Sequence, residues 1–240
     1  MKNSKTDHVD SIKSQCHSVV TTVAAVVGTA TALISQMHEA LDCLMADDCE
    51  KPSSHNYLVE QGYPFEIAVR CGNNQLEMSV ATEIASHQSL SDRLSIALGR
   101  VHQVCRNLGL QDELEPVTRL CAPEERKGEV VWLVHCAIMA AADCATLEIY
   151  LGPCYDKGLN MTDTDGANEK DQAVWRAVQD LLQAYGLGTE VEQLASIRKQ
   201  LTLPGRPAPQ ITFIGIDLGE GRPPRFKVYL NPNVSNANET

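Results

Sequence analysis

The stretch that decides the fold is residues 211–232, which read ITFIGIDLGEGRPPRFKVYLNP. Successive side chains of a β-strand point to opposite faces, so Arg225, Lys227 and Tyr229 share one face and the bulky apolar residues between them share the other. We expect a hairpin over residues 211–230, one strand of which presents two cations and a phenol on a single side.

This strand admits two interpretations. Its polar face is either solvated at the edge of an antiparallel sheet, or it lines a barrel whose outer side packs against helices and whose interior binds an anion. An earlier segment, residues 145–153, has the same layout and ends in x-Tyr-Leu-x-Pro. The tyrosines of the two segments, Tyr150 and Tyr229, are 79 residues apart, which leaves room for helices between hairpins and predicts a repeated unit.

Turn residues and apolar periodicity give the expected order of elements. It runs through a disordered tail (1–13), helix (14–48), hairpin (65–82), helix (89–109), hairpin (129–152), helices (171–185 and 189–201), hairpin (211–230) and a disordered tail (233–240). The predicted fold class is α+β in a single domain over 1–240. Its repeated ααββ units form an antiparallel β-barrel, or an open partial barrel, surrounded by helices.

Composition excludes several classes of function. The net charge of -11 argues against nucleic-acid binding, which depends on clustered Lys and Arg. The nine cysteines are odd in number and none shows C-x-x-C spacing, so neither a disulfide framework nor a zinc ribbon is predicted. We expect reduced thiols, no metal and a cytoplasmic location.

Residues 18–34 form an apolar run that has two readings. Preceding lysines and an Ala-Thr-Ala sequence are compatible with a secretory signal, which would make the chain a secreted protein of another class. The run also contains several threonines, is short for a membrane span and follows Asp7 and Asp10, which favours a buried helix of a soluble protein. We therefore expect no membrane association.

Three segments together resemble the indole prenyltransferases of the dimethylallyltryptophan synthase type. They are Gly62–Val69 (GYPFEIAV), Leu147–Pro153 (LEIYLGP) and Arg225–Pro232 (RFKVYLNP), of which the last, with R-x-K-x-Y, is the most specific. The resemblance covers residues 62–232. It implies three of the five ααββ repeats that close the barrel of that family, which is known as the ABBA fold.

The resemblance also implies a function and a set of residue roles. The protein would transfer a dimethylallyl or similar group from a prenyl diphosphate to an indole or tryptophan-derived aromatic, as in indole alkaloid secondary metabolism. It would need neither a metal nor another cofactor. Glu66 would hold the acceptor and help remove its proton, whereas Arg225, Lys227, Tyr229 and Tyr150 would bind the diphosphate.

Two positions depart from the family pattern. Glu77 stands where the family has an arginine, and Glu148 stands where it has the lysine of K-x-Y. Each change replaces a cation near the diphosphate with a carboxylate, which weakens binding unless the carboxylate is paired or protonated. The alternative is therefore a truncated or non-catalytic homologue that acts as a binding or assembly partner, forming a homo-oligomer or needing a second chain to close the barrel.

Overall fold

The computed structural model describes ten stretches of the chain. These are residues 11–45, 65–72, 75–84, 90–121, 130–140, 144–154, 167–202, 204, 208–219 and 222–231. They divide into two compact units. The first comprises Met1–Leu108 and His135–Leu147, and the second comprises Gly109–Val134 and Glu148–Thr240.

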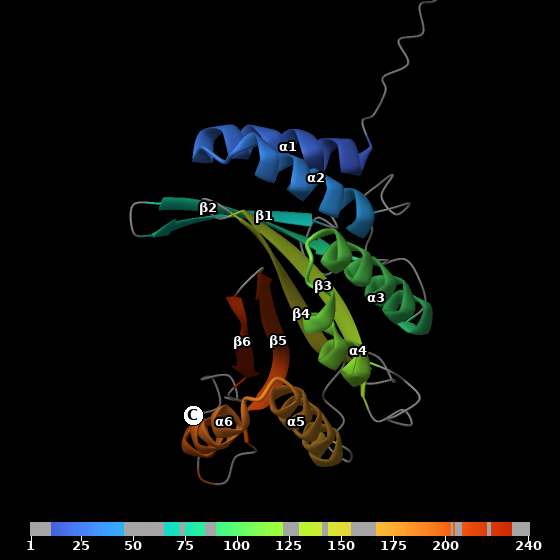
Figure 1. Ribbon diagram of the computed structural model, residues 1–240. Helices are drawn as coiled ribbons and strands as arrows, with labels where there is room; N and C mark the ends of the chain where they lie inside the picture. Colours follow the sequence, from blue (N-terminus) through green and yellow to red (C-terminus); the bar gives the residue numbers. More distant parts are fainter. Residues whose placement is uncertain are drawn as a thin grey trace, which may run out of the picture. The chain divides into compact units, whose positions relative to one another are not determined.

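Helices and paired strands alternate along the chain, as Figure 1 shows. In order, the elements are α1 (Ile12–Val27), α2 (Thr31–Leu44), β1 (Phe65–Gly72), β2 (Gln75–Glu83), α3 (Leu90–Asn107), the 3₁₀ turn η1 (Gln111–Leu114), α4 (Glu115–Cys121), β3 (Val131–Ala140), β4 (Ala145–Cys154), α5 (Ala167–Ala184), α6 (Gly188–Leu201), β5 (Gln210–Gly219) and β6 (Arg222–Asn231). The α+β class and the repeated ααββ order predicted from the sequence are confirmed.

The six strands form one antiparallel sheet in the order β1-β2-β3-β4-β5-β6. Neighbours in this order are also neighbours in sequence, so each hairpin simply adds to the one before it. Within the part of the chain that the structure describes, β1 and β6 are the edge strands. Of the two forms predicted, the open sheet is therefore the one observed.

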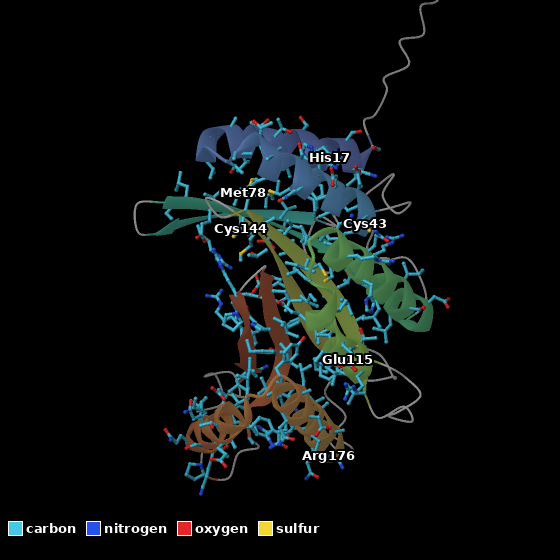
Figure 2. All side chains as sticks on the ribbon, viewed as in Figure 1. His17, Cys43, Met78, Glu115, Cys144 and Arg176 are labelled. Carbon is cyan, nitrogen blue, oxygen red and sulfur yellow. The ribbon has the colours of Figure 1, made fainter. Side chains whose placement is uncertain are left out.

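In the first unit, α1 and α2 pack against each other, and α1 also packs on β2. Ser11 caps the start of α1 by accepting a hydrogen bond from the Ser14 amide, and Gly28 ends it in a left-handed conformation (φ 80°). Met78 of β2 is fully buried on the sheet face that these helices cover (Figure 2). Apolar side chains of β3 extend that face, because Val80 lies opposite Ile138 in the antiparallel register.

Three details of the predicted helices are corrected by the structure. The segment expected to be one helix over 14–48 is two helices, because Gly28 takes a conformation that interrupts the first. Helix α1 already begins at Ile12, whose side chain is buried, so Ile12 and Lys13 do not belong to a disordered tail. Helix α4 was not predicted, since it has only seven residues and contains Pro116, which fits the first turn of a helix.

Other predictions fall outside the described residues. These are the remainder of the N-terminal tail, the C-terminal tail over 233–240, and residues 62–64 of the first family-like segment. Residues 65–69 of that segment are described and lie in β1.

In the second unit, β5 and β6 form the third hairpin, with α5 packed on β5. The apolar face of β6 meets the helical layer where Phe226 packs edge-on against Tyr185, with ring centroids 4.9 Å apart. Arg198 of α6 donates from Nε to the carbonyl of Pro209, the residue before β5, at 2.9 Å. It also pairs with Asp171 of α5 and lies over the ring of Trp175. The predicted sidedness of β6, with its apolar residues toward the helices, is thus observed within this unit.

None of the described helices is long and apolar enough to cross a membrane. The apolar run 18–34 spans the end of α1 and the start of α2. In α1 the residues that are buried recur every four positions, at Ile12, Cys16, Val20 and Ala24, which is the spacing of a helix with one face in a protein core.

Candidate functional site

Four of the five site residues predicted from the sequence lie together on one face of strands β4, β5 and β6. The register of β5 and β6 places Asp217 opposite Arg225, Gly215 opposite Lys227, and Phe213 opposite Tyr229. We name this surface the β4–β6 face and define it by its polar and aromatic side chains. They are Glu148, Tyr150, Phe213, Asp217, Arg225, Lys227 and Tyr229.

Lys227 is held by two carboxylates of this face. Its ammonium pairs with the carboxylate of Glu148 on β4, and it lies 3.2 Å from Oδ1 of Asp217 on β5. The Glu148 side chain is only 1% exposed, whereas that of Lys227 is 25% exposed. A buried carboxylate of this kind requires a counter-charge, and Lys227 provides it.

Arg225 is held by the same aspartate. Its Nε donates to Asp217 Oδ2 at 2.6 Å, and a terminal nitrogen of the guanidinium also contacts that oxygen. Burial raises the pKa of Asp217, but the hydrogen bonds that it accepts from Arg225 and Lys227, together with the charge of Lys227, outweigh burial and hold the pKa below its usual value. Asp217 is therefore a carboxylate at neutral pH, and it serves both cations.

The aromatic side chains of the face lie next to the charged group. Tyr150 and Tyr229 have ring centroids 6.3 Å apart, and Phe213 meets Tyr229 edge-on at 6.5 Å. Burial, a hydrogen bond with Glu148 and the charge of that carboxylate raise the pKa of Tyr150 well above its usual value. Tyr150 therefore stays a phenol and is available only as a neutral donor or acceptor.

Glycines on β4 and β5 make room for these rings. A Cβ on Gly152 would lie 2.8 Å from Cε1 of Phe213, which is closer than carbon atoms approach in proteins. A Cβ on Gly215 would meet Tyr150 and Lys227 at 3.4–3.5 Å, which is ordinary contact or slightly tighter. The close approach at Gly152 thus positions Phe213, and through it Tyr229.

The charges of the β4–β6 face balance. Two cations, Arg225 and Lys227, are matched by two carboxylates, Glu148 and Asp217. An ammonium has three donors and a guanidinium has five, so both cations retain donors beyond those the carboxylates use, and Arg225 is 62% exposed. The face can therefore donate hydrogen bonds to an anion, but without the net positive field that unpaired cations would create.

The fifth predicted residue, Glu66, lies on β1 of the first unit, where its side chain is exposed and the register places it opposite Ala81. Alternation places Ala68 and Arg70 on the same face of β1 as Glu66. Arg70 lies opposite Glu77. The carboxylate that replaces the family's arginine at Glu77 thus faces a cation across the hairpin.

Sequence reasoning missed three members of these two groups. Strand alternation counted from Glu66 reaches Arg70, so this signal was present in the sequence. Asp217 stands near the end of an apolar strand, and no local pattern indicates that it pairs with Arg225 and Lys227. Strand alternation counted back from Asp217 through Gly215 reaches Phe213, so this signal was also present.

Comparison with known proteins gives a fold and no closer relationship. No protein-family model matches the sequence. No curated protein matches it either.

Solved structures do match. A 6-dimethylallyl tryptophan synthase has a TM-score of 0.69 at 18% sequence identity, and the match covers 92% of this chain and 59% of that one. The 5-dimethylallyltryptophan synthase of Streptomyces coelicolor has a TM-score of 0.66 at 18% identity, with 92% and 58% covered. Prenyltransferase PriB, solved with L-tryptophan and dimethylallyl thiolodiphosphate, has a TM-score of 0.64 at 17% identity, with 91% and 57% covered.

These matches confirm the fold that the three sequence segments predicted. The chain has the architecture of tryptophan prenyltransferases over nine-tenths of its own length. It spans less than three-fifths of the length of the structures it matches. At this level of identity the likeness concerns the fold alone.

Proposed function

We propose that the protein is an aromatic prenyltransferase that moves a dimethylallyl or similar group from a prenyl diphosphate to an indole or tryptophan-derived acceptor. One observation supports this proposal most directly. Arg225, Lys227, Tyr229 and Tyr150 gather on one face of a sheet whose fold is shared with tryptophan prenyltransferases. Guanidinium, ammonium and phenol groups are the donors that stabilise a departing diphosphate.

In the proposed reaction, the bond between the allylic carbon and the diphosphate oxygen breaks, and the diphosphate leaves with the electron pair. Arg225 and Lys227 stabilise its developing charge through the donors that Asp217 and Glu148 leave available. The faces of Tyr150 and Tyr229 stabilise the allylic cation by roughly 0.5–2 kcal/mol per ring. A ring carbon of the acceptor then attacks the cation, and Glu66 accepts the proton that the ring loses.

Several finer points belong to this proposal. The reaction proceeds without metal, because the protein's own cations take the place of a metal ion. The compartment is the cytoplasm, which suits the seven cysteines whose side chains the structure describes, since each is a free thiol. The proposed ligands are a prenyl diphosphate and an aromatic acceptor. The proposed protein partner is either a second copy of this chain or another chain that completes the barrel.

The test is product formation from dimethylallyl diphosphate with L-tryptophan or tryptophan-containing cyclic dipeptides, followed by mass spectrometry with and without EDTA. We expect a mass increase of one dimethylallyl group, and we expect EDTA to leave it unchanged. Arg225→Ala and Lys227→Ala should lose it, whereas Arg119→Ala, which removes a cation from α4, should keep it. Folded protein that gives no product across the panel contradicts the proposal.

A second candidate function is favoured by the charge balance of the β4–β6 face. A non-catalytic homologue that acts as a binding or assembly partner has no need for unpaired cations, and here both cations are paired with carboxylates. Analytical ultracentrifugation distinguishes an assembly partner, which associates with a second chain, from a binding partner, which does not need to. A chain that sediments as a stable monomer and binds no second chain contradicts the assembly role.

A further inference from the structure

We propose that Glu148 is a specificity-determining residue of the β4–β6 face, because it serves as an internal counter-anion that competes with a diphosphate for Lys227. This inference rests on the proposed function, since it concerns the same diphosphate subsite. The new element is the role of Glu148, which lowers the affinity of the subsite for anions and thereby sets which phosphorylated ligands can bind.

The position of Glu148 puts it in competition with an anionic ligand. It lies on β4 next to Tyr150, and its buried carboxylate reaches the Lys227 ammonium on β6. A diphosphate oxygen that used the same ammonium donor would have to take the place of the Glu148 oxygen. Because both are anions, the ligand and the side chain compete for one cation.

Lys227 and Arg225 together depend on one pair of carboxylates. The Lys227 ammonium is within ion-pair distance of two carboxylates, Glu148 and Asp217 (3.2 Å), and Arg225 shares Asp217. If a ligand displaces Glu148, a carboxylate that is 1% exposed loses its ammonium partner. That loss opposes ligand binding, and it grows with the burial of the carboxylate.

The charge of the ligand decides how strongly these carboxylates oppose its binding. Repulsion from Glu148 and Asp217 increases with the negative charge of the ligand, so pyrophosphate is disfavoured more than inorganic phosphate. An uncharged aromatic ring on Tyr150, Tyr229 and Phe213 is not disfavoured at all. The face therefore selects against highly charged anions while its aromatic surface stays usable.

Glu148→Gln tests the proposal by removing the charge while keeping the shape. The amide oxygen can still accept hydrogen bonds from Lys227 and Tyr150, and Lys227 keeps Asp217 as its counter-ion, so we expect the variant to fold. Isothermal titration with inorganic pyrophosphate should show an affinity at least about tenfold higher than that of the unaltered protein. The gain for inorganic phosphate should be smaller, and binding of L-tryptophan should stay within twofold.

Glu115→Gln is the matched control. It removes the same charge from α4, where Glu115 pairs with Arg119 and lies outside the β4–β6 face (Figure 2). We expect it to leave pyrophosphate affinity within twofold. The double variant Glu148→Gln/Lys227→Met should lose the gain, because the cation that Glu148 masks is then absent.

Glu148→Met carries the same test if Glu148→Gln does not fold, since it also removes the Glu148 counter-charge from Lys227. Equal pyrophosphate affinity in the unaltered protein and a folded variant would overturn the proposal, as would the absence of pyrophosphate binding in all of them. The assay requires no turnover. A tighter-binding variant that forms no prenylated product therefore supports this inference and contradicts only the proposed reaction.

Discussion

The ammonium of Lys227 on β6 pairs with the buried carboxylate of Glu148 on β4, although the two residues are 79 positions apart in the chain. The contact ties the second hairpin to the third. It also explains how β4 tolerates a carboxylate between two fully buried residues, Leu147 and Ile149.

Lys227→Met should destabilise the second unit, because it leaves Glu148 buried without its counter-charge. We expect a loss of about 3 kcal/mol in the free energy of unfolding. Glu148→Gln should cost less, since no charge is then left unpaired. Urea denaturation followed by tryptophan fluorescence reports on this unit, because both tryptophans, Trp132 and Trp175, belong to it.

The control for this measurement is Arg119→Met. Arg119 pairs with Glu115 one helical turn away, and both side chains are more than half exposed, so the expected loss is under about 1 kcal/mol. Equal losses for Lys227→Met and Arg119→Met would show that the Glu148 pair contributes no more than a surface pair.

Arg93→Met should destabilise the first unit in the same way. The Arg93 guanidinium pairs with Glu83, donates from Nε to the Ile84 carbonyl at 3.1 Å, and is only 5% exposed. It joins the start of α3 to the end of β2. We expect a loss of about 3–5 kcal/mol, measured by urea denaturation with far-ultraviolet circular dichroism because this unit contains no tryptophan.

Glu83→Gln/Arg93→Met completes that experiment. If the loss in Arg93→Met comes from the unpaired Glu83 carboxylate, neutralising Glu83 as well should recover part of it. A double variant no more stable than Arg93→Met would instead assign the loss to the packing of the arginine side chain.

The sidedness of β6 could be predicted from sequence because it depends only on local alternation. Arg225, Lys227 and Tyr229 had to share a face once the segment was a strand, and the register with β5 bears this out. The partners of those residues could not be predicted in the same way. Whether Glu148 reaches Lys227 depends on which strands are neighbours and on their register, and neither follows from a local pattern.

The helical errors have a similar local cause. Residues 14–48 carry a continuous apolar periodicity, and the one signal of a break was Gly28, which is tolerated inside many helices. Helix α4 is too short to show a clear period, although Val117, Leu120 and Cys121 are buried. In both cases tertiary packing decided what propensity left open.

Gly152→Ala should cost about 1 kcal/mol of stability, because the new methyl group must displace the ring of Phe213. Phe213 is partly exposed, so the ring can move outward and the cost stays modest. Gly215→Ala is the matched control on β5. Its methyl group meets neighbours at 3.4–3.5 Å, so we expect almost no loss.

The two glycine variants also test the aromatic part of the site. Displacing Phe213 should disturb its edge-on contact with Tyr229. Quenching of the intrinsic fluorescence by an indole acceptor analogue should weaken in Gly152→Ala and not in Gly215→Ala. Equal weakening in both variants would show that the position of Phe213 does not affect ligand binding.

His135 should make the stability of the first unit depend on pH. Burial lowers its pKa, the carboxylate of Glu83 partly opposes this, and the guanidinium of Arg93 adds to it, which places the pKa at about 4 against an ordinary value of 6.5. The unfolded chain therefore binds a proton at a higher pH than the folded protein does. Stability from this group is complete above pH 6.5 and is lost as the pH falls toward 4.

The effect can be measured by urea denaturation at pH 7.5 and pH 5. From the two pKa values, His135 should contribute a loss of about 2 kcal/mol between these conditions. His135→Gln cannot be protonated, so its stability should fall by that much less over the same interval, whatever its stability at pH 7.5. An unchanged difference between the two conditions would mean that the imidazole is already accessible to protons in the folded protein.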